Sequence, residues 1–466
     1  MTPESSARCG RGSGPMDDRL VAGIDLGSTG IKLLVLDEDG TEVLVEEIPT
    51  PWRPGPGGTA DLPVPTLVSA VHRLVGAAAG RLATVTDRTV GAIAVAGMGE
   101  SGVLLDGDGD AVAPAFAWFD PRGAEQVANL PERIRSEFAG RTGLPLGAQT
   151  SVAKLAYLRD SGIRLVGRCW LNLPEFVATV LGGRPTAEYS LASRTGLLDQ
   201  DTGLPWDAML DELGVTPAFL PPLEPAGTDL GAVSERFPAP FAGARIAVGG
   251  HDHLVAAEAA GTIGDGRYHV SIGTAEVLLR VVDAPLGYAA RARLAEYLIN
   301  EVRHVVPGKH VLVAGVKTGL LLRRALQTFG VGDRAGRDRL DAAVLDLPYE
   351  GALPDGGIEV SGARNDDGEL AITVRTDGVS PAEVVAAVLR HSNDEIARLV
   401  TAIDRELPPA TSATLTGGWA GMDSVRRARA QVLPGVTVSG RAQETAYGAA
   451  LVAARLTPAG DPAPAR

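Results

Sequence analysis

Hydrophobic and polar positions follow the same pattern in two distant parts of the chain. Residues 21–36 contain two apolar stretches around a turn of small residues at 27–30, and residues 41–48 alternate like a further strand. Residues 268–282 repeat this layout around a turn at 273–276, about 250 residues later. Apolar stretches that flank a short turn of Gly, Ser and Thr are typical of β-hairpins. The sequence therefore predicts two similar strand–turn–strand units.

The remaining elements follow from apolar runs and from helical spacing. Further strands are expected at residues 90–96, 103–105, 245–248 and 413–416. Helices are expected at residues 62–82, 254–260, 380–407 and 444–456, with mixed helical patterns over 124–182. Strands that alternate with helices indicate an α/β fold.

The repeated unit predicts two α/β domains that face each other across a cleft. A Pro-rich stretch at 217–240 precedes the expected boundary between them. We expect domains at residues 19–244 and 245–456, a disordered extension at 1–18 and a flexible tail at 457–466.

Composition narrows the class of protein. The 466 residues include 43 Lys+Arg and 57 Asp+Glu, a net charge of −14, and 45% of them are hydrophobic. These proportions exclude wholesale disorder, and the acidic balance argues against a surface for nucleic acid or anionic membranes. Two cysteines, Cys9 and Cys169, cannot build a disulfide framework or a Cys-rich metal centre. No apolar run suits a signal peptide or a membrane span, so we expect a cytoplasmic protein.

The first motif that carries chemistry is the turn of residues 25–32, Asp-Leu-Gly-Ser-Thr-Gly-Ile-Lys. A tight turn of small residues exposes consecutive backbone N–H groups, which bind phosphate oxygens. Ser28 and Thr29 add hydroxyl donors, and Lys32 adds a positive charge. Asp25, at the end of an apolar strand, suits a ligand of a metal ion or of its water shell. The alternative is an ordinary hairpin turn with a capping Asp.

Two further turns follow strands in the second half of the chain. Residues 271–275 again lead from a strand into small hydroxyl residues, and a nucleotide phosphate chain held between two lobes needs a donor turn from each. At 417–420, two glycines before Trp and Ala let a flat ring lie against the backbone. An ordinary turn is the alternative for each of these motifs.

An Asp between two histidines follows the strand expected at 245–248. A buried charge at the end of a strand needs partners, so core packing alone does not explain His251, Asp252 and His253. Three interpretations remain open for Asp252: a general base, part of a metal site, or the N-cap of the next helix.

Aromatic and charged residues gather in two segments near residue 100. Residues 98–101 read Met-Gly-Glu-Ser, and residues 118–122 read Trp-Phe-Asp-Pro-Arg. Ring stacking and charged hydrogen bonds of this kind suit a polyhydroxylated ligand. A surface ion pair between Asp120 and Arg122 is the alternative.

Taken in order, these motifs resemble the FGGY family of carbohydrate kinases, within the actin-like, ribonuclease-H-like ATPase superfamily. Each match is weak alone, but the set is ordered and runs from residue 21 to about residue 455. The matching segments are 25–32, 97–106, 117–122, 249–253, 271–276, 417–420 and 444–450.

The resemblance implies two ribonuclease-H-like domains that close over a sugar and ATP with Mg²⁺. Asp252 would match the catalytic base, and Asp25 the acidic residue beside the metal. The nucleotide would be held by two phosphate loops and an adenosine pocket, formed by Gly27, Ser28, Thr29 and Lys32, by Gly273 and Thr274, and by Gly417, Gly418 and Trp419. The sugar would contact Gly99, Glu100, Trp118, Asp120, Arg122, His251 and Asp252.

The expected activity is transfer of the γ-phosphoryl group of ATP to a hydroxyl of a sugar or polyol. Met98-Gly99-Glu100 stands where xylulokinases usually carry Gln-Met-His, and Lys317 and residues 359–380 also depart from the family pattern. We expect ATP and a small sugar or polyol as partners, with no nucleic acid and no membrane, and we allow for a homodimer. The alternatives are a non-catalytic actin-like nucleotide switch and a His/Asp metal hydrolase.

Overall fold

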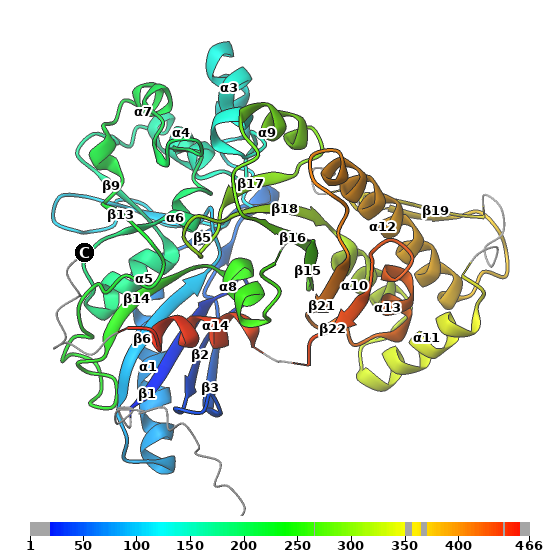
Figure 1. Cartoon of the computed structure of the whole chain (residues 1–466), viewed down its shortest axis with the longest axis horizontal. Coiled ribbons are helices and arrows are strands. Elements are labelled where there is room, and N and C mark those ends of the chain that lie inside the picture. Colours follow the sequence, from blue (N-terminus) through cyan, green and yellow to red (C-terminus); the bar gives the residue numbers. More distant parts are fainter. Residues whose placement is uncertain (1–18, 265, 350–356, 365–370, 441–442, 457–466) are drawn as a thin grey trace, which may run out of the picture.

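The computed structural model describes residues 19–264, 266–349, 357–364, 371–440 and 443–456. The expected N-terminal extension and C-terminal tail lie outside the described residues. Two lobes, each built around one β-sheet, make up the fold (Figure 1). The predicted α/β class is confirmed.

The first sheet has the strand order β14-β6-β1-β2-β3. β1 (Leu20–Leu26), β2 (Gly30–Leu36) and β3 (Glu42–Pro49) form the antiparallel meander that the alternating pattern predicts. β6 (Val90–Gly97) and β14 (Arg245–His251) add parallel strands beside β1.

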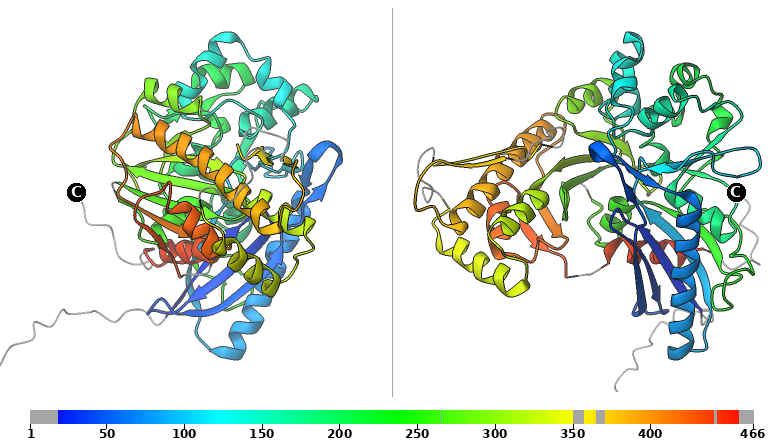
Figure 2. Two further views of the ribbon diagram at one scale, coloured as in Figure 1. Left: turned by 90° about the vertical axis from the view of Figure 1, so that its right-hand side faces the viewer. Right: turned by 180° about the vertical axis from the view of Figure 1, so that it is seen from behind.

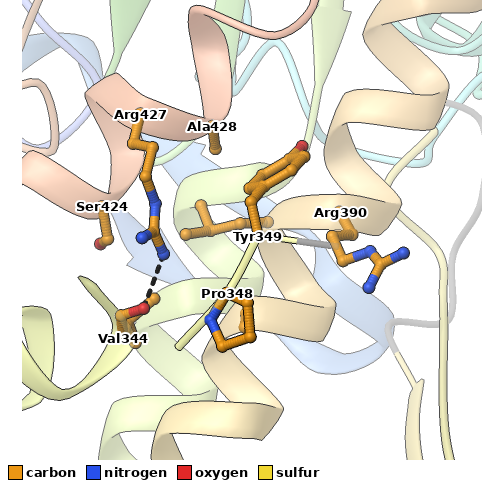
Figure 3. A pocket seen from close by; sticks show the side chains of 9 residues that line it. Val344, Pro348, Tyr349, Arg390, Ser424, Arg427 and Ala428 are labelled. Carbon is orange, nitrogen blue, oxygen red and sulfur yellow. Dashed lines mark hydrogen bonds between the residues drawn. The ribbon is translucent and has the colours of Figure 1, made fainter. Parts of the chain in front are cut away.

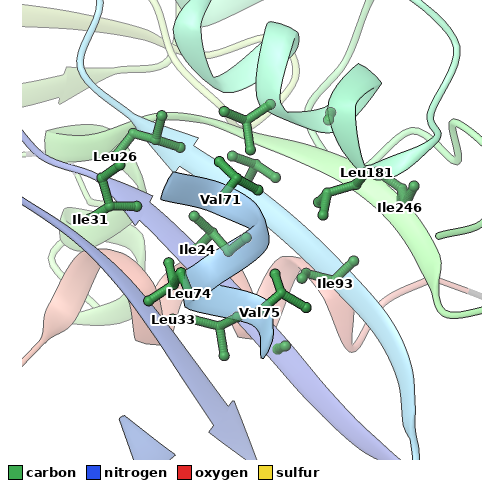
Figure 4. Close-up of a cluster of buried hydrophobic side chains, with 14 of the residues drawn as sticks. Ile24, Leu26, Ile31, Leu33, Val71, Leu74, Val75, Ile93, Leu181 and Ile246 are labelled. Carbon is green, nitrogen blue, oxygen red and sulfur yellow. The ribbon is translucent and has the colours of Figure 1, made fainter. Parts of the chain in front are cut away.

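The two faces of this sheet carry side chains of different size. Large residues such as Ile24, Leu33 and Ile93 pack under α1 (Val64–Val85), as Figure 4 shows. On the opposite face, a Cβ on Gly23 would lie 2.0 Å from the carbonyl oxygen of Ala446, so only glycine permits this approach. The small residues on this face therefore let the C-terminal helix α14 (Glu444–Ala453) lie directly on the sheet.

The second sheet has the order β17-β18-β16-β15-β21-β22, and its centre repeats the topology of the first. β15 (Arg267–Ile272) and β16 (Glu276–Val282) form the second predicted hairpin, and β21 (Ser412–Thr416) lies parallel to β15. The helix α12 (Pro381–Asp404) begins with a capping box between Ser380 and Glu383 and packs its apolar side into the core of this lobe (Figure 2). The remaining strands are β17 (Asn300–Arg303), β18 (His310–Val316) and β22 (Val436–Val438).

The first sheet extends beyond the expected domain boundary at 244/245. β14 is hydrogen-bonded to β6, and α8 (Asp252–Ala259), which follows it, packs against α14. Local patterns give no sign of this arrangement, because it depends on which distant strand offers a free edge. The first lobe therefore includes residues from three parts of the chain.

Other helices and short strands surround the two sheets. The region predicted as mixed helical also contains a strand, β9 (Cys169–Asn172), which pairs with β7 (Gly102–Leu105). In the first lobe, the additional elements are β4 (Arg53–Pro54), β5 (Ala60–Leu62), β7 (Gly102–Leu105), β8 (Ala115–Phe116), α2 (Ala124–Ala128), α3 (Glu132–Thr142), α4 (Ser151–Asp160), β9 (Cys169–Asn172), α5 (Leu173–Leu181), β10 (Ala187–Glu188), α6 (Tyr189–Ala192), β11 (Leu198–Asp199), β12 (Leu204–Pro205), α7 (Asp207–Leu213) and β13 (Leu223–Glu224). The second lobe adds α9 (Tyr288–Ala295), α10 (Thr318–Thr328), α11 (Arg334–Asp346), β19 (Ile358–Ser361), β20 (Ala371–Val374) and α13 (Asp423–Arg429). Within the described ranges, no helix combines the length and apolarity that a bilayer crossing requires.

Candidate active site

Three parallel strands of the first sheet end at the same level. Leu26 of β1 lies beside Gly97 of β6, and Gly97 lies beside His251 of β14. The carboxyl edge of an α/β sheet is where ligands usually bind. This register brings together segments that the sequence analysis identified separately.

A bulge in β14 sets the direction of its last residues. The pairing with β6 shifts between Val248 and Gly250, and Gly250 has a φ of 105°. A Cβ at Gly250 would lie 2.7 Å from Ser190 Oγ, so both the backbone conformation and the available space require glycine. The bulge directs the chain into α8, whose first residue is Asp252.

Asp252 is held as a carboxylate between two histidines. Its Oδ1 accepts a hydrogen bond of 2.6 Å from the backbone N–H of His253 and lies 3.5 Å from His251 Nδ1. Burial raises the pKa of Asp252, but His253, His251 and Arg194 together outweigh that effect and lower it below its usual value. His251 occupies the N-cap position, so Asp252 lies in the first turn of the helix instead of capping it.

Asp25 at the end of β1 is the second carboxylate of this edge. Burial, followed by the charge of Asp252, raises the pKa of Asp25 to about 7, while Lys32 opposes the rise. Lys32 lies directly opposite Asp25 in the β1–β2 pairing and also lies 4.0 Å from Glu47. Asp25 Oδ1 is buried without a hydrogen-bond partner in the described structure.

The first turn is held by two residues from the segment that follows β3. Thr50 Oγ1 donates a hydrogen bond of 2.7 Å to the carbonyl of Gly27, and Trp52 Nε1 donates one of 2.8 Å to the carbonyl of Ser28. Thr29 is exposed. Because the carbonyls are held by the protein, the turn is fixed in one conformation.

Gly99 and Glu100 follow β6 at the same edge. A Cβ on Gly99 would lie 2.9 Å from the ring of His251 and 3.0 Å from Arg194 Cγ. Arg194 Nε donates a hydrogen bond of 2.5 Å to Glu100 Oε1. Burial raises the pKa of Glu100, Arg194 opposes it, and Asp252 raises it further, so Glu100 lies within electrostatic range of Asp252. No motif in the sequence includes Arg194, because its partner lies far away in the chain.

The segment from Trp118 to Arg122 divides into two parts. Asp120 is fully buried, and its oxygens accept hydrogen bonds from the backbone of Ala60 and Arg122 and from the Arg122 guanidinium. The ion pair that was the alternative interpretation is therefore present, but its carboxylate is buried and fixes this loop. Trp118 is half-buried, and its ring lies 5.4 Å from that of the exposed Phe119.

The second turn and the expected adenosine pocket lie side by side in the other lobe. Ser271 pairs with Thr416, so Gly273 and Gly417 follow neighbouring parallel strands. Trp419 N donates a hydrogen bond of 3.2 Å to the carbonyl of Ile272. Thr274, Gly417 and Gly418 are exposed.

The start of α10 completes this region. A Cβ on Gly319 would lie 1.8 Å from the carbonyl oxygen of Gly273 and 2.8 Å from Trp419 Nε1. The helix therefore packs directly against the second turn. The sequence of residues 315–320 contains glycines but does not by itself predict this contact. Lys317 immediately precedes the helix and donates its backbone N–H to Ala363, at 2.7 Å.

A buried ion pair lies directly after the second turn, at the start of β16. Arg429 and Glu276 are both fully buried and form two hydrogen bonds of 2.6 Å. The same guanidinium donates to Asn393, Ser392 and Thr318. The network joins β16, α10, α12 and α13, and no local pattern in the sequence predicts it.

The described residues contain no group of three or more His, Cys, Asp or Glu side chains arranged to hold a metal ion. Asp25 can supply one protein ligand, which fits Mg²⁺, since this ion commonly keeps water and phosphate oxygens in its shell. The buried Oδ1 without a partner fits such a role.

A pocket elsewhere in the second lobe is too small for a nucleotide or a sugar. It lies between α11, α12 and α13, with Val344, Tyr349 and Arg427 among its lining residues (Figure 3). Its volume of about 10 Å³ is no more than one water molecule requires. It is therefore no candidate for the active site.

Comparison with known proteins gives matches throughout the chain. Residues 20–258 match the model of the FGGY family of carbohydrate kinases, N-terminal domain. A xylulose kinase of Streptomyces rubiginosus is 30% identical over 270 residues, which are 56% of this chain and 54% of the relative. The chain spans about half the length of the first curated relatives it matches.

Two solved structures share the fold over nearly the whole chain. The gluconate kinase of Lactobacillus acidophilus has a TM-score of 0.80 at 17% identity, covering 93% of this chain and 88% of its own. The glycerol kinase of Plasmodium falciparum, solved with ADP, has a TM-score of 0.79 at 16% identity, covering 93% and 89%. The family model matches more than half of the residues, and the chain belongs to the FGGY family of carbohydrate kinases.

Proposed function

We propose that the protein transfers the γ-phosphoryl group of ATP to a hydroxyl group of a sugar or polyol. The observation that carries the proposal is the position of Asp252. It follows the carboxyl edge of the first sheet, its pKa is lowered, and it interacts electrostatically with Asp25 and Glu100. A carboxylate that stays ionised at neutral pH can accept a proton from an acceptor hydroxyl.

Asp252 is proposed as the general base. As the acceptor oxygen attacks, its proton moves to the Asp252 carboxylate, which is one-fifth exposed and thus within reach of a ligand. Phosphoryl transfer depends mainly on alignment and on neutralising charge, with little covalent work for the protein. The backbone N–H of His253, which donates a hydrogen bond to the Asp252 carboxylate, and the charge of Arg194 contribute by keeping the base ionised.

The two turns are proposed as the phosphate-binding loops. Gly27, Ser28 and Thr29 would bind from the first lobe, assisted by Lys32, and Gly273 and Thr274 from the second. Gly417, Gly418 and Trp419 would hold the adenosine, next to the second turn. The ADP in the glycerol kinase neighbour, which has the same fold, supports a nucleotide as one substrate.

Asp25 is proposed as the residue that binds Mg²⁺ directly or through water. When bound, Mg²⁺ would neutralise charge on the phosphate oxygens. Asp25 is suited to it because burial and the charge of Asp252 make its carboxylate costly to ionise without a cation.

Acceptor binding is proposed for Gly99, Glu100, Trp118 and His251, next to Asp252. Asp120 and Arg122 would act indirectly, because their polar atoms are bound to each other and to Ala60 and Asp61. The relatives are named for xylulose, gluconate and glycerol, so we propose the class of sugars and polyols without choosing a member. A homodimer and a cytoplasmic location remain predictions.

A coupled assay of ADP release tests the proposal. Purified protein with Mg²⁺ and ATP is screened against pentuloses, hexuloses, aldoses, gluconate and polyols. We expect ADP release that depends on one class of acceptor, and a phosphorylated product detectable by mass spectrometry. Release of ADP at the same rate with and without every acceptor would support the nucleotide switch instead.

A further inference from the structure

We propose that Arg194 is a positioning residue for the acceptor: it holds Glu100 in the geometry that binds the acceptor beside Asp252. The inference rests on the proposed function and deepens it, because it assigns a role to a residue that the motifs leave out. Arg194 directly follows Ser193 at the end of α6 and is separated in sequence from every motif described above.

Glu100 needs an external partner to keep its position. Its φ of 60° lies in the left-handed region, which is unfavourable for a residue with a side chain. The residue is only 8% exposed, so its carboxylate has lost most of its contact with water. A buried carboxylate in an unfavourable backbone conformation persists only when its surroundings fix it.

Arg194 supplies this constraint through two nitrogens. Nε and Nη2 both contact Glu100 Oε1, with the Nε bond at 2.5 Å. Both side chains are 11% exposed. A Cβ on Gly99 would lie only 3.0 Å from Arg194 Cγ, so the arginine side chain fills the space next to the glycine. The guanidinium therefore fixes the carboxylate, while the aliphatic part of Arg194 packs next to the backbone of Gly99.

Another cation nearby cannot take over this role. Lys154 lies close enough to interact electrostatically with Glu100. Its ammonium group, however, donates to the backbone carbonyls of Asp120 and Ala148. Lys154 is thus committed to the loop around Asp120, and Arg194 makes the direct contact with Glu100.

The position of the pair connects it to the acceptor and not to the nucleotide. Both Glu100 and Arg194 interact electrostatically with Asp252, the proposed base. With Oε1 bound by Arg194, Glu100 Oε2 can accept hydrogen bonds from acceptor hydroxyl groups. Loss of Arg194 should therefore weaken acceptor binding while leaving nucleotide binding nearly unchanged.

Steady-state kinetics of variants tests the inference, with the acceptor identified in the screen above. For Arg194→Met we expect the KM for the acceptor to rise by about tenfold or more, the scale of one charged hydrogen bond, and the KM for ATP to change less than about twofold. Arg194→Lys should restore part of the loss, because it retains the charge but not the two-nitrogen contact. Arg141→Met is the matched control, since Arg141 pairs with Glu137 and Asp199, which lie outside the proposed site.

A double variant distinguishes positioning from a general structural effect. Because Arg194 acts through Glu100, Arg194→Met combined with Glu100→Gln should be no worse than Glu100→Gln alone. Fully additive losses, equal changes in both KM values, or a normal acceptor KM in Arg194→Met would overturn the inference. If Arg194→Met does not fold, Arg194→Lys and Glu100→Gln give the same comparison. Wild-type protein that phosphorylates no acceptor would instead overturn the proposed function and this inference with it.

Discussion

Asp25 and Asp252 interact at the carboxyl edge of the first sheet: burial and then the charge of Asp252 raise the pKa of Asp25 to about 7. Asp25 is the penultimate residue of β1 and Asp252 is the first residue of α8, so most of the first lobe separates them in sequence. Two carboxylates that share a buried site resist being ionised together unless a cation lies between or beside them. The pair therefore supports both the proposed base and the proposed metal ligand.

Replacing Asp25 by Asn should weaken the response to Mg²⁺. The amide has nearly the same shape but carries no charge, so we expect the Mg²⁺ concentration for half-maximal activity to rise by about tenfold or more. The measurement is acceptor-dependent ADP release as a function of free Mg²⁺. Glu46→Gln, which removes a charge that pairs with Arg81 outside the proposed site, is the control and should respond like wild type. An unchanged Mg²⁺ requirement in Asp25→Asn would contradict the role of Asp25.

Replacing Ser190 by Ala should slow the reaction, because it removes a hydrogen bond that fixes His251, the residue before the proposed base. Ser190 Oγ accepts a hydrogen bond of 3.0 Å from the backbone N–H of His251 and donates one of 2.5 Å to Glu188. A small displacement of a catalytic group costs roughly tenfold to hundredfold in rate, so we expect kcat to fall on that scale. Ser193→Ala is a matched control, because the hydroxyl of this buried serine donates to the carbonyl of Tyr189 in its own helix. Equal kcat values for the two variants would refute the prediction.

The buried His269 should make the protein sensitive to acid. Burial lowers the pKa of His269 to about 3, and its ring nitrogens lie 3.1 and 3.5 Å from Thr262 Oγ1 and Thr416 Oγ1. Between pH 6.5 and about 3, the unfolded chain binds a proton there that the folded protein does not. The free energy of unfolding therefore falls as the pH falls, by up to about 1.4 kcal/mol per pH unit.

Denaturant unfolding at several pH values between 7.5 and 4.5 measures this slope. His269→Gln should flatten it, because glutamine retains polar contacts and does not titrate. The exposed His72 provides the control, since His72→Gln should leave the slope as in wild type. A His269→Gln profile parallel to that of wild type would show that His269 is not responsible.

Removing one partner of the ion pair between Glu276 and Arg429 should strongly lower the free energy of unfolding. Arg429→Met leaves a buried carboxylate without its counter-charge, which costs about 3–5 kcal/mol in the free energy of unfolding. Glu276→Gln combined with Arg429→Met should recover part of the loss. The exposed pair of Arg293 and Glu406 is the control, and its disruption should change stability little. An equal loss of thermal stability on disruption of either pair would contradict the larger contribution of the buried pair.

The sequence predicts the elements of this fold well because its local patterns are strong. The structure contains both expected hairpins, with their turns at Gly27 and Gly273. It also contains the expected helix α12, with Pro381 in its first turn. Alternation and turn residues act over a few positions, so they can be recognised without knowing the tertiary structure.

Contacts between distant segments could not be predicted in this way. β14 belongs to the first sheet because β6 offers it an edge, and α14 returns to that sheet because Gly23 leaves room. Arg194 contacts Glu100, and Arg429 contacts Glu276, only after the chain has folded. These pairs depend on three-dimensional proximity, and one sequence contains no periodicity that reveals it.

The most direct test of the central claim is the rate of phosphoryl transfer by Asp252→Asn with saturating ATP, Mg²⁺ and acceptor. We predict a loss of roughly 10²–10⁴-fold or more in kcat, the range of general-base catalysis, with ATP affinity close to that of wild type in a binding measurement. A variant that turns over at nearly the wild-type rate would contradict Asp252 as the base and the arrangement of the site built around it.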